Sequence, residues 1–265
     1  MSVVLTEKSD GVLTVTLNRP DKKNAVNSEV MCGLYDAWVD LDQDPEIRCA
    51  ILTGKGDTFC AGMDLSEIPK LSSGQADNDY MKRVMSEPDV IYGAWLKTYR
   101  PTKPVILAAE GFARAGGTEI LQGTDIRVAG ESAVFGVTEV QRGLFPMAGS
   151  TVRLRRQIGY AVAAEMLLCG EDLPAKRAHE LGLINHVVPD GKALEKAREI
   201  AARIAANGPL AVKAILSVLR QTEMLPEEQA WELEQKEGMG VMMSKDAREG
   251  PKAFLEKRKP NFTGE

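Results

Sequence analysis

The stretch GFARAGGTE, residues 111–119, follows an apolar run at residues 105–109 that is typical of a buried β-strand. Gly116 and Gly117 then open a short helix that carries Glu119. Free backbone N–H groups at the start of a helix stabilise negative charge, and glycines let a ligand approach the backbone closely. The pattern therefore indicates an anion or oxyanion site in outline. Tight packing of the helix against the strand would use the same glycines, so this alternative stays open at this point.

Two other stretches also combine a strand-like run with a glycine turn. FCAGMD, residues 59–64, follows a strand-like run and a glycine-rich turn, and FGVTE, residues 135–139, leads into GLFP at residues 143–146. Glu119 and Glu139 each lie beside a glycine turn. A lone glutamate on a helix is usually solvated. Two carboxylates that face one pocket can divide into an acid and a base, because neighbouring like charges cannot both ionise easily. The two glutamates are therefore candidate catalytic residues.

Hydrophobic periodicity predicts an α/β fold. Residues 13–17 alternate apolar residues with threonines, which predicts one strand of a hairpin. Asn27 or Ser28 can cap the helix that follows, whose apolar residues recur every three or four positions. The order strand, strand, helix then continues, with further strands predicted at residues 49–53, 105–109, 126–129 and 133–135.

The second half of the chain is predicted to be mainly helical from residue 151 onward. Residues 184–188 form the only late strand pattern, and Pro174 suits the first turn of a helix. Residues 206–265 contain no strand pattern, which indicates a helical addition to the α/β core. The least regular stretch, between Asp64 and Arg100, is expected to hold a mobile loop and a helix.

Composition excludes several classes of protein. The 265 residues carry a net charge of -5 and no basic stripe, which argues against a nucleic-acid binder. The beginning of the chain does not resemble a signal peptide, and no apolar run reaches about 18 residues, so we expect no membrane span. The four cysteines form no CxxC pair and there are only two histidines. We therefore expect no disulfides, no metal and buried reduced thiols in a cytoplasmic protein.

The three stretches resemble, in the same order, the signature segments of the crotonase (enoyl-CoA hydratase/isomerase) superfamily. LNRP at residues 17–20, followed by Asn24-Ala25, and AFLEKRKP at residues 253–260 resemble that family as well. Five such motifs in register cover essentially the whole chain. The resemblance implies an α/β, crotonase-like spiral of repeated ββα units. Residues 1–205 would form the spiral core with an acyl-CoA site, and residues 206–265 a helical C-terminal oligomerisation region.

The resemblance also implies a chemistry, because members of this family bind acyl-CoA thioesters and stabilise a thioester enolate. By position, the backbone amides of Met63 and Gly116 would form the oxyanion hole. Glu139 would protonate Cα in the hydration direction, and Glu119 would hold and activate the attacking water. No metal or cofactor is implied, since Coenzyme A is part of the substrate. The remaining implied substrate-binding positions are Lys22, Lys23, Ala25, Ala61, Asp64, Leu65, Gly117 and Lys257.

The lysines, together with Arg258, are candidates to meet the phosphates of Coenzyme A. The basic residues 257–259 are equally compatible with a solvated helix end. In the family, the adenine end of Coenzyme A often contacts a neighbouring subunit, and members are commonly trimers. The resemblance therefore implies a homotrimer or a dimer of trimers. Leu216, Leu219 and other apolar residues of the tail would serve that interface or cover their own core.

Four positions depart from the family's pattern. Ala115 replaces the first of three glycines found in many hydratases, and Met147 stands where a glycine is common. Arg114 is an unusual charge before the glycine turn, and Ser66 stands where some relatives carry a lysine. The departures bear on the substrate and, to a lesser degree, on the reaction type, and they leave the two glutamates in place.

The leading hypothesis is a lyase that hydrates a 2-enoyl-CoA to a 3-hydroxyacyl-CoA. Enoyl-CoA isomerisation is the nearest alternative, but an isomerase needs only one carboxylate. A non-catalytic acyl-CoA-binding protein would have no need for a matched pair of acids. A nucleotide-dependent oxidoreductase is disfavoured, because no G-x-G-x-x-G follows a strand near the beginning of the chain.

Overall fold

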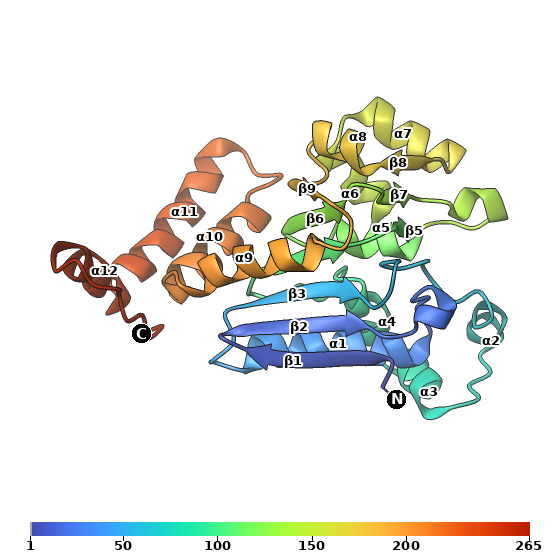
Figure 1. Cartoon of the computed structure of the whole chain (residues 1–265), viewed down its shortest axis with the longest axis horizontal. Helices are drawn as coiled ribbons and strands as arrows, with labels where there is room; N and C mark the ends of the chain where they lie inside the picture. The colour runs from blue at the N-terminus through green and yellow to red at the C-terminus, as the bar shows by residue number, and fades with distance from the viewer. Residues whose placement is uncertain (1) are drawn as a thin grey trace.

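The computed structural model describes residues 2–265 of the chain, and within this range the strands form two sheets (Figure 1). The main sheet contains, in spatial order, β1 (Val4–Ser9), β2 (Val12–Leu17), β3 (Cys49–Gly54), β4 (Val105–Ala109), β6 (Ile126–Gly130) and β9 (His186–Val188). The small sheet contains β5 (Phe112–Arg114), β7 (Val134–Gly136) and β8 (Asp172–Pro174). Strands β1 and β2 form the predicted antiparallel hairpin, and the rest of the main sheet is parallel.

Successive units pass through both sheets. Strand β4 lies in the main sheet, β5 in the small sheet, and helix α5 (Gly116–Leu121) follows; β6, β7 and helix α6 (Ser150–Gln157) repeat that order. Because β5 pairs with β7 in parallel and β4 pairs with β6 in parallel, each unit stacks on the preceding one. The predicted α/β spiral of ββα units is therefore confirmed.

The central strands of the main sheet, β3 and β4, are buried on both faces. Leu52 and Leu107 point toward helix α1 (Ser28–Gln43) in the larger core cluster. Ile51 and Ile106 point toward the other face, where helix α9 (Ala193–Ala205) covers them. Continuous apolar strands such as residues 49–53 are what a parallel sheet covered on both faces requires. Helix α1 begins as predicted, because the Asn27 side chain accepts a 3.0 Å hydrogen bond from the Val30 amide.

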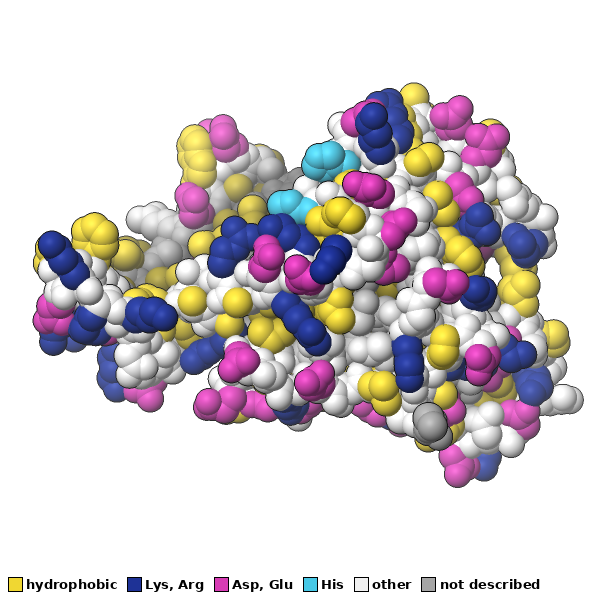
Figure 2. Space-filling model, in the orientation of Figure 1, with side chains coloured by type: hydrophobic (Ala, Val, Ile, Leu, Met, Phe, Trp, Pro, Cys, Tyr) yellow, Lys and Arg dark blue, Asp and Glu magenta, His cyan; other side chains and the backbone are white. Residues whose placement is uncertain are grey.

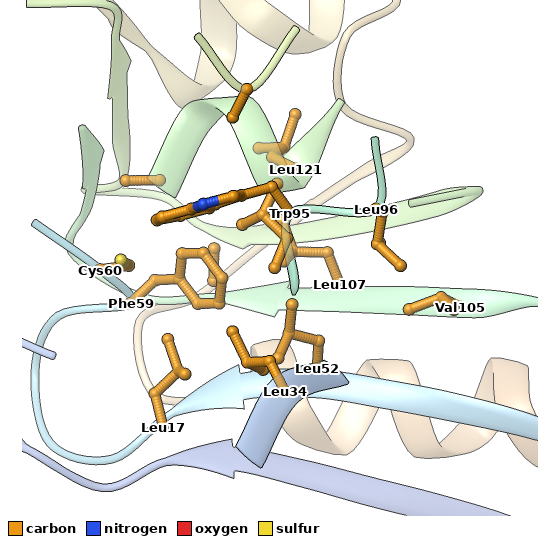
Figure 3. Packing of buried hydrophobic residues seen from close by; sticks show 14 of the residues in the cluster. Leu17, Leu34, Leu52, Phe59, Cys60, Trp95, Leu96, Val105, Leu107 and Leu121 are labelled. Carbon is orange, nitrogen blue, oxygen red and sulfur yellow. The ribbon is translucent and has the colours of Figure 1, made fainter. Parts of the chain in front are cut away.

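The irregular stretch before β4 is more helical than expected. It contains α2 (Ile68–Ser73), α3 (Asp79–Ser86) and α4 (Pro88–Ala94). Trp95 and Leu96 follow α4, and Figure 3 shows the Trp95 indole between Leu121 on one side and Phe59 and Leu107 on the other. Leu96 is fully buried and has a φ of 56°, in the left-handed region. This stretch is therefore anchored in the core directly after α4.

The second half is largely helical, with corrections to the predicted elements. Strand β8 was not predicted, so the prediction of one late strand is wrong, and Pro174 ends β8 and precedes α8 instead of lying in the first turn of that helix. The three residues of β8 are too few to show a period. The helices of this half include α7 (Tyr160–Cys169), α8 (Ala175–Glu180), α10 (Pro209–Gln221), α11 (Glu227–Met242) and α12 (Asp246–Leu255).

Helices α11 and α12 project away from the sheets (Figure 1). Figure 2 shows hydrophobic side chains on the surface of this part of the chain. Among residues 2–265 no single helix is both long and apolar enough to cross a bilayer; α9 and α10 reach that length and composition only as a pair bent by 110°. Cys32, Cys49 and Cys60 are buried free thiols, but Cys169 is exposed, so the expectation of four buried thiols is wrong for this residue at a helix end.

Candidate functional site

One cavity collects the residues with catalytic potential. Its volume is about 550 Å³, and its wall comes from the turn after β3, from α2, α4 and α5, and from the segment after β7. Four of the predicted site residues line it together: Met63, Gly116, Glu119 and Glu139. Ala61 and Leu65 line it as well, and Leu65 is exposed at its edge. Figure 2 shows the surface hollowed on the side of the molecule where these elements lie.

The turn after β3 is fixed against the start of α5. The Cys60 amide donates to the Phe112 carbonyl at 3.1 Å, and the Arg114 amide donates to the Cys60 carbonyl at 3.0 Å. A β-carbon on Gly62, whose φ is 93°, would lie 3.1 Å from the Gly116 nitrogen. Cys60 and Ala113 thus form a parallel β-bridge, which holds the segments that carry Met63 and Gly116 side by side.

The amides of Met63 and Gly116 are both available to a ligand. Gly116 is the first residue of α5, so its N–H has no acceptor within the helix. Within residues 2–265, neither amide donates to a backbone or side-chain acceptor. Both residues line the same cavity. Two free N–H donors that are fixed in position and face one cavity can stabilise an oxyanion.

Trp95 packs closely against Gly116 at the start of α5. A β-carbon on Gly116 would lie 2.6 Å from the Trp95 ring, which is nearly buried. Only glycine therefore fits beside the indole without a shift of the ring or of α5. Gly117, which was predicted to bind substrate, does not line the cavity. A β-carbon there would lie 2.6 Å from the Cys60 carbonyl oxygen, so Gly117 allows close packing of the two segments.

Glu119 is an almost buried carboxylate with backbone support. It is 3% exposed, and its Oε1 accepts a 3.0 Å hydrogen bond from the Ser150 amide. Burial raises the pKa of Glu119, while the amides of Ser150, Ala148 and Gly149 and the charge of Lys97 act in the opposite direction. Gly149 has a φ of 125°, which favours glycine at this position. The turn before α6 thus stabilises the ionised form of Glu119.

Glu139 has the opposite environment. It begins the short 3-10 helix η2 (Glu139–Arg142), and its Oε2 is buried with no hydrogen-bond partner in the described part of the chain. Burial, followed by the negative charge of Glu119, raises the pKa of Glu139 to about 7, while Arg142 acts weakly against this. At neutral pH Glu139 is therefore protonated in a large fraction of molecules. One carboxylate supported by amides and one unpartnered carboxylic acid face the same cavity.

The other predicted substrate-binding residues lie outside this wall. Asp64 pairs with Arg19 at 3.1 Å and accepts a hydrogen bond from the Ser66 hydroxyl at 2.7 Å. Lys22, Lys23 and Ala25 lie in the turn after β2, where the Lys23 carbonyl accepts a 2.9 Å hydrogen bond from the Ala61 amide. This turn is therefore next to the cavity without lining it.

Lys257 is separated from the other predicted residues. It follows α12, which Figure 1 shows at the opposite end of the molecule from α2 and β5. It does not line the cavity. Within one chain, the structure does not bring Lys257 to the site.

The departures from the family pattern have structural consequences. Ala115 has a φ of 51° and a ψ of -124°, a backbone conformation that favours glycine. Met147 and Arg114 line the cavity. The Arg114 guanidinium is paired with Asp172 and lies 4.9 Å from the centre of the Phe112 ring. Ser66 does not reach the cavity.

The sequence did not reveal two contacts of the site: the packing of Trp95 against Gly116 and the backbone amides that surround Glu119. Trp95 lies in a stretch expected to be irregular, and the three amides before α6 belong to a turn that was not singled out. The one available signal was the sequence Ala148-Gly149-Ser150 just after Pro146, because a glycine turn before a helix offers free amides. Among the described residues, no three His, Cys, Asp or Glu side chains lie together as a metal-ligand set.

Known proteins resemble this chain over its whole length. The family described as Enoyl-CoA hydratase/isomerase matches residues 7–265. Enoyl-CoA hydratase EchA19 of Mycobacterium tuberculosis is 54% identical over 258 residues, which cover 97% of this chain and 95% of that protein. The 2,3-dehydroadipyl-CoA hydratase of Escherichia coli is 33% identical over 264 residues and 100% of both chains. The crystal structure of an enoyl-CoA hydratase from M. tuberculosis superposes with a TM-score of 0.91 at 42% identity and 100% coverage of both chains.

Proposed function

Because the chain belongs to the enoyl-CoA hydratase/isomerase family of the crotonase superfamily, we propose that it adds water to a 2-enoyl-CoA through a thioester enolate held by the amides of Met63 and Gly116. The chain is a hydratase-type lyase that acts on acyl-CoA thioesters. The observation that supports this division of roles is the contrast between Glu119, which accepts backbone hydrogen bonds, and Glu139, whose Oε2 has no partner among residues 2–265.

In the proposed reaction, the Glu119 carboxylate accepts a proton from water as the water oxygen bonds to Cβ. The π electrons of the enoyl group move toward the thioester oxygen, which the amides of Met63 and Gly116 stabilise. Fixed donors of this kind contribute a factor of about 10²–10³ each to the rate. The Glu139 carboxylic acid then gives its proton to Cα. The product is a 3-hydroxyacyl-CoA, and the reaction leaves Glu119 protonated and Glu139 ionised until they exchange protons with solvent.

The raised pKa of Glu139 suits this role. A carboxylic acid with a pKa of about 7 holds its proton at neutral pH and still releases it readily. Burial raises the pKa of Glu119 as well, but the amides of residues 148–150 and the charge of Lys97 oppose that rise and favour its ionised form. Water addition changes no net oxidation state, so the proposed reaction needs no cofactor besides the CoA of its substrate.

The test is the loss of enoyl-thioester absorbance with crotonyl-CoA and with longer 2-enoyl-CoA substrates. Rapid loss is expected in the wild-type protein, with kcat reduced by about 10²-fold or more in Glu119→Gln and in Glu139→Gln. Glu131→Gln, at an exposed position outside the cavity, is the matched control and should keep full activity. Measurable binding of the CoA esters without loss at any chain length would overturn hydration. A shift of a 3-enoyl-CoA double bond would then indicate isomerisation.

We also propose how the CoA portion binds. Lys22 and Lys23 are exposed in the turn next to Ala61, where they can meet phosphates at the edge of the cavity. Lys257, at the other end of the chain, would meet Coenzyme A only when a second subunit presents it. Substitution of Lys22 and Lys23 by Gln should raise KM for the CoA ester with little change in kcat, because the phosphates lie far from the reacting carbons.

The C-terminal helices support an oligomer. Leu216 is buried against its own chain, whereas many other apolar residues of α10–α12 are exposed. An apolar surface of this kind usually marks an interface. We propose that residues 206–265 assemble a homotrimer or a dimer of trimers. Light scattering should give a mass of three or six chains, and a monomer would overturn this assignment without affecting hydration. The exposed residues are Ile215, Leu219, Trp231, Met239, Met242, Met243, Phe254 and Leu255.

A further inference from the structure

Two segments beside the cavity hold each other through a pair of cationic side chains. The Lys97 ammonium group donates a 2.6 Å hydrogen bond to the Met147 carbonyl. In the other direction, the Arg153 guanidinium donates a 2.5 Å hydrogen bond to the Leu96 carbonyl. The segment after α4 is thus joined at two points to the turn that precedes α6 and to α6 itself.

Each of the joined segments supports one part of the catalytic site. Trp95, next to Leu96, packs against Gly116, whose amide is one of the two oxyanion donors. The turn that follows Met147 supplies the amide hydrogen bonds to Glu119. A movement of one segment relative to the other would therefore change the orientation of the Glu119 side chain relative to the proposed oxyanion donors.

The segment after α4 is held in one conformation. Leu96 is fully buried with a φ of 56°, a conformation that a bulky residue keeps only when its surroundings enforce it. The Lys97 ammonium nitrogen lies 4.5 Å from the centre of the Tyr92 ring, so this group is held by the ring as well as by the Met147 carbonyl. The Arg153 side chain also passes over Gly149, where a β-carbon would lie 3.5 Å from its Cδ. The lysine and the arginine are therefore fixed in position, although Lys97 is reached by solvent.

Charges from three directions face Glu119. Lys97 comes from the segment after α4, Arg153 comes from α6, and Glu139 comes from η2. Arg142, on η2, faces Glu139. The positive charges of Lys97 and Arg153 both favour the ionised form of Glu119, whereas the charge of Glu139 opposes it. The carbonyl that Lys97 binds belongs to the residue directly before the amides that hold Glu119.

We propose that Lys97 is a positioning residue for hydration: through its hydrogen bond to Met147 it fixes the turn of residues 147–150, which holds the Glu119 carboxylate. This inference rests on the proposed function, because it assigns Lys97 to the support of the water-activating group. A lysine that only braced the fold would affect stability without changing the titration of Glu119.

The test measures the titration of Glu119 directly. In a Glu139→Gln background, infrared spectroscopy follows the C=O stretch of the protonated Glu119 carboxyl group with pH, and the band is identified by its loss in Glu119→Gln. Lys97→Met should move the midpoint to higher pH, because a nearby positive charge has been removed. Lys97→Arg should return it toward the starting value, and Lys176→Met, at an exposed position on α8, should not change it.

Kinetics give the second measurement. In the otherwise unsubstituted enzyme, Lys97→Met should lower kcat for crotonyl-CoA by about 10-fold or more, with a smaller change in KM, since a misplaced catalytic group mainly affects the reacting step. It should also move the acidic limb of the pH–rate profile upward. An unchanged infrared midpoint in Lys97→Met would overturn the inference. Because that midpoint needs no substrate, it decides the role of Lys97 even if the hydration proposal itself fails.

Discussion

The indole of Trp95 lies so close to Gly116 that a β-carbon on Gly116 would come within 2.6 Å of the ring. Gly116→Ala should therefore displace α5 or the indole, at a cost of about 1–3 kcal/mol in unfolding free energy. Because the Gly116 amide is a proposed oxyanion donor, kcat should fall by about 10²–10³. Gly159→Ala is the control, since a β-carbon there meets no atom within 4 Å and its φ is -58°. Equal effects of the two substitutions on urea unfolding and kcat would contradict this account.

The pH–rate profile should be bell-shaped and the same for hydration and dehydration. In the proposed scheme, hydration needs ionised Glu119 and protonated Glu139. Dehydration needs the same single proton on Glu119 instead of Glu139. Because the pair titrates as a unit, both directions use its singly protonated form. With the pKa of Glu139 at about 7, kcat/KM should decline above neutral pH, and it should also decline in acid as both groups become protonated. A flat profile between pH 5 and pH 9 would rule out this scheme.

Glu139→Gln should make the folded protein more stable in alkaline solution. The folded state holds the Glu139 proton more tightly than the unfolded chain, because the pKa rises from 4.5 to about 7. The contribution of protonated Glu139 to the unfolding free energy is therefore fully present below pH 4.5, and it is lost as the pH rises through 7. Removal of the charge should raise the unfolding free energy by about 1–3 kcal/mol at pH 8.5 and by little at pH 4.5. Urea unfolding at both values checks this, with Glu131→Gln as a control that should show no pH-dependent gain.

Ala115→Gly should stabilise the protein. Ala115 has a φ of 51°, where a β-carbon is strained by about 1–3 kcal/mol. The greater freedom of glycine in the unfolded chain opposes this by about 0.4–1 kcal/mol, so a net gain of about 1 kcal/mol is expected. On the exposed surface of α7, Ala161→Gly should instead lose about 1 kcal/mol, since glycine is a poor helix former. Thermal unfolding of both variants would show opposite shifts, and a loss in Ala115→Gly would disprove the strain.

Periodicity was sufficient for the elements with long patterns. Helix α1 and the buried strands β3 and β4 were predicted because their apolar residues repeat over several positions. Strand β8 has only three residues and alternates one buried residue with two exposed ones, which leaves no pattern to read. The two glutamates came from their place beside glycine turns and from the family resemblance. Their presence on one cavity wall depends on how the units stack, and no local pattern contains that information.

The different electrostatic environments of Glu119 and Glu139 could not be predicted from the sequence either. It depends on the amide of Ser150, which reaches Glu119 across 31 positions of the chain, and on the missing partner of Glu139. Backbone amides carry no residue-specific signal, so only the conformation of the turn before α6 reveals them. The positions of Lys97 and Trp95 were hidden for the same reason, because their neighbours come from distant segments.

The stacked units distribute the site along the chain in order. Met63 follows β3, Gly116 and Glu119 follow β4 and β5, and Glu139 follows β7. A chain that has folded only through α5 would possess both proposed oxyanion donors and Glu119, but not Glu139, the proposed proton donor for Cα. The enolate-stabilising part and the proton-donating part are therefore separable along the sequence. In this scheme, a substitution at Glu139 would change how the enolate is protonated, while Met63 and Gly116, which hold the enolate, stay unchanged.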